Sequence, residues 1–139
     1  YSFGYSSSGF TDMPMNHKVF LAQFDAIKKL ASEGPCVMVG RCADYALAEY
    51  KDCFSVFVHA DTDWRISRLS QKHNKTAKEA KDMINKTDKS RSSYYNYYTN
   101  KKWGAAASYN LCVDSSKLGI DGAAKAIIQA IEIFDSMKK

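Results

Sequence analysis

The sequence predicts an α/β fold in which helices flank a parallel sheet. Three short runs are almost wholly apolar, and helical patterns separate them: "CVMVG" from Cys36, "FSVFVHA" from Phe54 and "YNLCVDSS" from Tyr109. Strands that are apolar on both faces are typical of parallel sheets that helices cover on both sides. A length of 139 residues and a hydrophobic share of 45% are enough for one core of ordinary size.

The first part of the chain is predicted to be a linker followed by a helix. Residues 1–15 are rich in Ser, Gly and Tyr and read as a loop or linker. A helix is expected from Asn16 to the stop signal at Gly34 and Pro35, because apolar residues recur at helical spacing at Phe20, Phe24, Ile27 and Ala31. Residues 16–139 are expected to form a single domain, with a short helix around residues 45–50.

Capping signals place the later helices. Asp61 or Thr62 can cap a helix that ends near His73 and Asn74. The run from Thr76 to Glu79 has the form of a capping box, so another helix should begin there. The last helix should turn one apolar stripe to the core, formed by Ala123, Ile127, Ile131 and Phe134.

Positive charge is concentrated in one segment. The net charge is +5, yet residues 65–102 hold eleven Lys/Arg against three Asp/Glu, whereas the rest of the chain holds nine against twelve. This asymmetry indicates an anionic partner: a nucleotide, a nucleic acid or another phosphate compound. The alternative is a solvated, lysine-rich helix face without a ligand.

One apparent phosphate-binding motif is rejected. Gly4 and Gly9 have the Gly-x-x-x-x-Gly spacing of a P-loop, but Phe10 stands where that loop needs Lys. No strand is predicted before them. Since the loop binds phosphates through its backbone N–H groups and that Lys together, the match carries no functional prediction.

The arginines are the best candidates for a binding site. Arg41 follows a predicted strand and Gly40, which suits bidentate contact with a phosphate; the alternative is an ion pair with Asp44. Arg65 and Arg68 are three residues apart and share a helix face, as do Asp88 and Arg91. Asp88 is a candidate acceptor for a sugar hydroxyl, or else a partner for a neighbouring cation on its own helix.

Other residue types give weaker signals. The aromatic stretch that includes Tyr94, Tyr95 and Tyr98 can stack on exposed bases, but core or rim packing is the favoured interpretation. The four cysteines show no CxxC spacing, which favours reduced thiols in a cytoplasmic protein. The three histidines are scattered, and no residue is assigned as a metal ligand. No apolar run is long enough for a membrane span.

Four segments in order resemble the cytidylate kinase-like family of nucleoside monophosphate kinases: "GPCVMVGRCADYAL", "VFVHADTDWRISRL", "KTDKSRSSYYNYYTNKKWG" and "SYNLCVDSSKLGI". The likeness runs from about Met15 to the C-terminus. It implies a three-layer P-loop fold that uses ATP with Mg²⁺ to phosphorylate a nucleoside monophosphate such as CMP.

The resemblance also implies roles for individual residues. Arg41 and Arg91 would hold phosphate, and Asp88 would contact the acceptor ribose. Arg65 and Arg68 would lie at the base of a basic lid, about residues 65–102, that folds over the phosphates. With Asp44, these positions give the predicted site: Arg65, Arg68 and Arg91 for catalysis, and Arg41, Asp44, Asp88 and Arg91 for acceptor binding.

Three departures from the family pattern qualify this interpretation. Cys42 stands where the family has an Asp that helps to read the nucleoside, and Val39 replaces an acidic residue. The first strand with its Gly-rich loop and Lys is not found in these residues, so the fold is expected to lack that part.

Two alternatives stay open: a nucleic-acid-binding module that uses residues 88–104, and an inactive regulatory protein on a kinase fold. Nucleotides are the favoured partners over nucleic acid, and self-association is left open.

Overall fold

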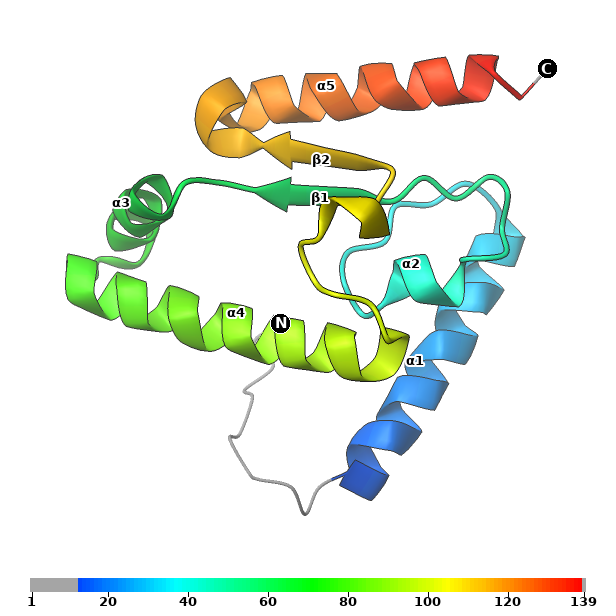
Figure 1. Ribbon diagram of the computed structural model, residues 1–139, viewed down its shortest axis with the longest axis horizontal. Helices are drawn as coiled ribbons and strands as arrows, with labels where there is room; N and C mark the ends of the chain where they lie inside the picture. Colours follow the sequence, from blue (N-terminus) through cyan, green and yellow to red (C-terminus); the bar gives the residue numbers. More distant parts are fainter. Residues whose placement is uncertain (1–12, 139) are drawn as a thin grey trace. The chain divides into compact units, whose positions relative to one another are not determined.

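The structure, a computed structural model, describes residues 13–138 (Figure 1). The chain divides into two compact units, residues 1–51 and 52–139, and each is described by itself. The predicted single domain over 16–139 therefore stays a prediction. Most of the predicted linker, including the rejected Gly4–Gly9 motif, lies outside the described residues.

The first unit is built on one long helix. Helix α1 spans Met13–Glu33 and begins three residues before the predicted start at Asn16, with Pro14 in its first turn, where a missing N–H costs nothing. Phe20 and Ile27 are buried on one side of this helix, as their spacing predicts. The ring of Phe24 lies 6.2 Å from that of Tyr45, which helps to join α1 to the short helix α2 (Ala43–Ala46).

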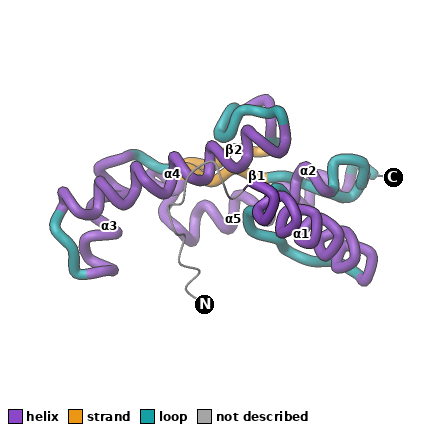
Figure 2. The backbone as a smooth tube through the Cα atoms, turned by 90° about the horizontal axis from the view of Figure 1, so that it is seen from below, coloured by secondary structure: helices purple, strands orange, loops and turns teal. Residues whose placement is uncertain are grey.

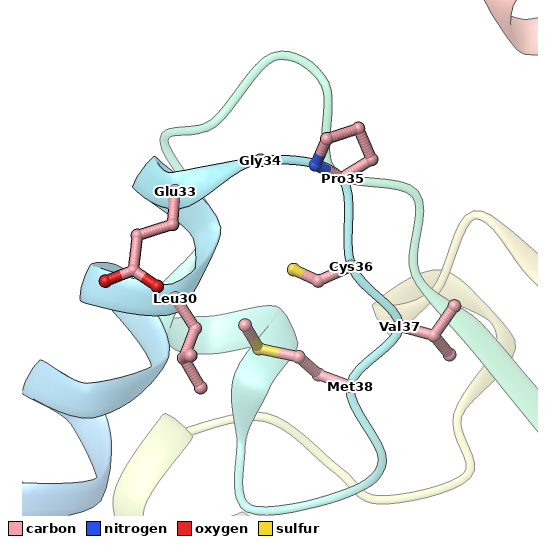
Figure 3. Close-up of a pocket in the computed structure, with 7 residues that line it drawn as sticks. All are labelled: Leu30, Glu33, Gly34, Pro35, Cys36, Val37 and Met38. Atoms are coloured by element: carbon pink, nitrogen blue, oxygen red, sulfur yellow. The ribbon is translucent and has the colours of Figure 1, made fainter.

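The predicted strand at "CVMVG" is wrong. Residues 35–39 have no regular structure, and the side chains of Val37 and Val39 are 94% and 91% exposed. Cys36 and Met38 point toward α1 while Val37 points away (Figure 3). The run thus alternates like a strand, but none of the described residues pairs with it. Since a strand is stabilised by hydrogen bonds to a neighbour and by burial of its faces, an apolar run without either does not become one.

The second unit contains a small parallel sheet. Strand β1 (Val56–His59) pairs with β2 (Leu111–Asp114) in a register that sets Val58 opposite Val113. The two strands lie side by side in Figure 1 and overlap when they are seen from below in Figure 2. Two of the three predicted strands are confirmed, and the architecture is a helix-rich α/β arrangement with a two-stranded parallel sheet.

The carboxyl ends of the two strands are tied together. The hydroxyl of Ser115 donates to the carbonyl oxygen of His59 at 3.1 Å, and the N–H of Asp61 donates to Oγ of Ser116 at 3.2 Å. Hydrogen bonds from Ser116 lower the pKa of the Asp114 carboxyl. Residues 59–61 and 114–116 therefore meet at one edge of the sheet.

Two helices form a hairpin beyond this edge (Figure 1). Helix α3 (Thr62–His73) is capped by Asp61, whose carboxylate accepts from the N–H groups of Asp63 and Trp64, and it ends at the left-handed Asn74. Helix α4 (Ala77–Thr99) begins with the predicted capping box of Thr76 and Glu79. Ala80 and Ile84, four residues apart on α4, are buried.

Aromatic side chains attach the end of α4 to the sheet. The ring of Phe57 in β1 lies 5.2 Å from Trp103 and 4.9 Å from Tyr109, and Tyr95 is 6% exposed. Gly104 has a φ of +77°, and a Cβ there would lie 3.3 Å from the Phe57 ring. A short 3₁₀ helix, η2 (Ala106–Ser108), follows this junction. The tyrosine stretch therefore contributes to packing, as favoured from the sequence.

The last helix covers the strands with only part of its apolar surface. Helix α5 (Ser115–Ser136) packs on β1 and β2 and has a non-helical Gly119 near its start. Of the predicted stripe, Ala123 is buried and Ile127 and Phe134 are half-buried, whereas Ile131 is 37% exposed. Other apolar residues of α5 are exposed, including Ile128 and Ile133. Among the described helices, none combines the length and apolar character of a membrane span.

Candidate phosphate-binding site

The turn that carries Arg41 has an unusual backbone. Gly40, Arg41 and Cys42 have φ values of 72°, 56° and 57°, so three successive residues are left-handed. The turn closes through the N–H of Ala43, which donates to the carbonyl oxygen of Gly40 at 3.1 Å. A left-handed L-residue costs roughly 1–2 kcal/mol, and such conformations concentrate at functional sites. The exposed Arg41 therefore lies on a turn whose left-handed backbone conformation is unfavourable in free energy.

Cys42 is buried, whereas its neighbour Arg41 is exposed. Its side chain is 4% exposed, and its pKa is raised to about 11 by burial and, secondarily, by the carboxylate of Asp44. The thiol is therefore neutral near pH 7 and offers no nucleophile. Asp44 is half-buried in the first turn of α2. Because these residues belong to the first unit, their convergence with Arg91 stays a prediction.

Arg65 and Asp88 join the two helices of the hairpin. One Arg65 Nη donates to an Asp88 carboxylate oxygen at 2.7 Å, and the other Nη donates to the second oxygen at 2.9 Å. The side chains are 29% and 25% exposed, so the pair is largely shielded from water. A bidentate guanidinium–carboxylate pair is strong and fixes orientation. Two predicted site residues are thus in direct contact, although they are 23 positions apart in the sequence.

The other two hairpin arginines are exposed. The Arg68 guanidinium carbon lies 5.6 Å from the centre of the Trp64 ring, so Arg68 and Arg65 have different partners despite their shared spacing. Arg91 lies one turn beyond Asp88 on α4 and has no ion-pair partner within the described residues. It follows Ala80 and Ile84 along the helix face that packs inward, yet it is exposed. A cation in that place is available to an anionic ligand.

The basic segment makes the hairpin surface strongly positive. Of its eleven Lys and Arg residues, only Arg65 is half-buried, and the other ten are exposed. No ion pair within residues 13–138 neutralises any of those ten. Helix α3 and the first part of α4 lie beyond the carboxyl ends of the parallel strands, where α/β sheets bind ligands, and the rest of α4 runs back along the sheet (Figure 1). A surface of this kind attracts phosphate groups.

Three further tyrosines lie on the outer part of α4. The ring of Tyr98 is 4.9 Å from Tyr94 and 4.9 Å from Tyr97, and Tyr97 is 60% exposed. They form one aromatic cluster on the helix. The stacking of bases on these rings stays an untested alternative, while the packing role of Tyr95 is clear.

A hollow in the first unit contains none of the predicted site residues. It measures about 280 Å³ and is lined by Leu30, Glu33, Gly34, Pro35, Cys36, Val37 and Met38 (Figure 3). Its wall includes the unpaired run that was predicted to be a strand. Within the described range, no group of three His, Cys, Asp or Glu side chains is arranged to hold a metal ion.

The Arg65–Asp88 contact was not predicted, because sequence reasoning paired Asp88 with cations on its own helix. One signal was present: Asp88 follows the apolar Ile84 by four residues and precedes Tyr95 by seven, which places it on the inward face of α4. A carboxylate on such a face requires a partner from another element.

The chain is a helix-rich α/β protein with a strongly positive hairpin surface. The sequence model of the Cytidylate kinase-like family matches residues 1–117, and the chain belongs to that family. It is also similar to the crystal structure of an uncharacterized protein from Eubacterium ventriosum ATCC 27560. The two are 32% identical, with a TM-score of 0.81 over 84% of this chain and 74% of that chain. No curated protein matches the chain.

Proposed function

We propose that the chain takes part in ATP-dependent phosphoryl transfer to a nucleoside monophosphate, with a cytidylate kinase-like acceptor site. The observation that carries this proposal is the family match over residues 1–117, which includes every predicted site residue from Arg41 to Arg91. The exposed cations of the hairpin support it, because two nucleotides bring several negative charges to one place.

The reaction needs no nucleophilic side chain. An oxygen of the acceptor phosphate attacks the γ-phosphorus of ATP in line, and ADP leaves with the electrons of the broken P–O bond. The protein contributes positioning and stabilisation of the charge on the transferred group. Guanidinium groups suit both tasks, since they keep their charge and bind phosphate oxygens in a fixed geometry.

We assign these tasks among the predicted residues. Arg41 and Arg91 hold the acceptor phosphate, and Asp44 lies beside the acceptor. Arg65 and Arg68 stabilise the transferring phosphoryl group from the root of a lid formed by the basic hairpin. Closure of that lid excludes water and so suppresses hydrolysis of ATP.

Asp88 is proposed to accept a hydrogen bond from the acceptor ribose. Arg65 uses one position on each carboxylate oxygen, and a carboxylate offers about four acceptor positions. The ion pair therefore leaves room for a sugar hydroxyl. Preference for cytosine is not part of the proposal, because Cys42 is neutral and buried at the place of the family's Asp.

The ATP cradle is proposed to lie on a strand and P-loop that are not among the described residues. Two features support a further strand. Within the described residues β1 pairs with β2 alone, and Val58 in β1 is 52% exposed. The apolar run at Val37 and Val39 is exposed and pairs with no strand of residues 13–138. One more apolar strand would satisfy such edges, as parallel sheets require.

The proposed reaction implies Mg²⁺ as a cofactor. ATP-dependent transfer uses Mg²⁺, which binds substrate phosphates together with one or two carboxylates. Within the described residues no group of three His, Cys, Asp or Glu side chains is arranged to hold a metal ion, so the substrate phosphates would supply most of the Mg²⁺ ligands.

The direct test is a coupled assay of ADP formation with ATP, Mg²⁺ and a panel of nucleoside monophosphates. We expect turnover that depends on the monophosphate and falls by about 100-fold in Arg91→Ala. Lys72→Ala, an exposed cation on the same hairpin, should keep nearly full activity. ATP hydrolysis that does not depend on the added monophosphate, or equal losses of activity in both variants, would refute the proposal.

A further inference from the structure

The ion pair between α3 and α4 presents Arg65 in a particular way. A guanidinium has five N–H donors arranged as a rigid fork. Asp88 accepts from both Nη atoms, which is the end-on geometry. The Nε–H and the remaining Nη–H groups have no partner among the described residues, and the side chain is 29% exposed. One edge of the fork is thus fixed by the protein, and a second edge is available to a ligand.

The hairpin gives Arg65 little other support. No residue of α3 is buried, so helix packing alone does not set the side chain's direction. The ion pair supplies the only side-chain hydrogen bonds that link α3 to α4 in the described part of the chain. A long arginine without such a partner loses its orientation to rotamer freedom.

We infer that Asp88 is a positioning residue: it orients the Arg65 guanidinium so that its free edge binds a ligand phosphate. This inference rests on the proposed function for the identity of the ligand and deepens it. The carboxylate acts through Arg65, in addition to any contact with a ribose. Its effect must then extend to phosphate ligands that have no sugar.

The experiment measures the affinity for inorganic pyrophosphate, a probe without ribose, and for CMP by calorimetry. Asp88→Asn keeps the size of the side chain but removes the charged acceptor. We expect it to weaken pyrophosphate binding by about tenfold, and CMP binding should fall as well because the proposed ribose contact is lost. Asp82→Asn, an exposed acid on the same helix, removes the same charge and should change either affinity less than about twofold.

A double-mutant cycle separates positioning from a direct contact. Arg65→Gln should weaken pyrophosphate binding by about tenfold or more, and adding Asp88→Asn should cause no further loss. If Asp88→Asn fails to fold, the Arg65→Lys variant tests the same inference. Lys keeps the charge but lacks the planar guanidinium, so it cannot bind the Asp88 carboxylate on one edge and a phosphate on another. Asp88→Glu should then have no effect in the Arg65→Lys background, while it weakens binding in the wild type.

The outcomes distinguish this inference from the proposed function. Loss of CMP affinity with unchanged pyrophosphate affinity in Asp88→Asn would overturn the positioning role and leave the ribose contact. Additive losses in the cycle would overturn it as well. If the wild type binds pyrophosphate with the expected coupling but phosphorylates no monophosphate, the inference stands and the proposed function fails. A wild type that does not bind pyrophosphate overturns the positioning role, whereas the proposed function is then decided by the assay of ADP formation.

Discussion

The second unit contains two regions with opposite properties. The strands and α5 form a packed body, in which Val113 and Ala123 are 4% exposed and Phe57 contacts two aromatic rings. The α3–α4 hairpin has eight exposed cations, and α3 has no buried residue. Segments that bind ligands and move are drawn from the less stable parts of proteins. The comparison therefore assigns stability to the body and ligand chemistry to the hairpin.

The largest stability effect is expected in the body. Phe57→Ala removes a ring that contacts both Trp103 and Tyr109, and we expect a loss of about 3 kcal/mol in the free energy of unfolding. Arg91→Ala on the hairpin should change it by less than about 0.5 kcal/mol. Urea unfolding measures both. Similar losses in the two variants would remove the distinction between body and hairpin.

The junction between hairpin and body provides the next test. Gly104→Ala places a Cβ 3.3 Å from the Phe57 ring at a φ of +77°, and we expect a loss of about 2 kcal/mol. Asn100→Gly, at the left-handed end of α4 (φ 55°), relieves strain and should be neutral within about 0.5 kcal/mol. If Gly104→Ala is as stable as the wild type, the close packing of Gly104 on Phe57 is not important for stability.

A smaller effect should come from the ion pair. Arg65→Gln leaves a partly shielded carboxylate without its partner, and we expect a loss of about 1 kcal/mol. Hydrogen exchange should speed up mainly in α3, because the pair is its side-chain tie to α4. Asp82→Asn is the control and should leave exchange unchanged. Faster exchange in β1 and β2 instead would mean that the pair stabilises the body.

Local signals in the sequence predicted local structure well. The capping box at Thr76 and Glu79, the cap at Asp61 and the stop at Asn74 depend on residues within one turn, and all three are confirmed. Their hydrogen bonds are formed by neighbours in the chain, so no knowledge of the tertiary fold is needed.

Features that depend on distant residues were harder to predict. The run at Val37 has the composition of a strand, but composition does not show whether a partner strand is present. The contact between Arg65 and Asp88 joins two helices, while sequence spacing reveals only pairs within one helix. The arginines and Asp88 were candidate site residues from their placement and spacing, and the family resemblance gave them individual roles. Membership of the family is confirmed, whereas the roles stay predictions.

The most direct test of the account is the affinity for CMP of three variants measured side by side: Arg41→Ala, Arg91→Ala and Lys72→Ala. If guanidiniums from separate parts of the chain hold one acceptor phosphate, the first two should each weaken binding by about tenfold or more, and the third by less than about twofold. Equal losses in all three would show that the hairpin attracts anions only by its overall charge, and would contradict a defined acceptor site.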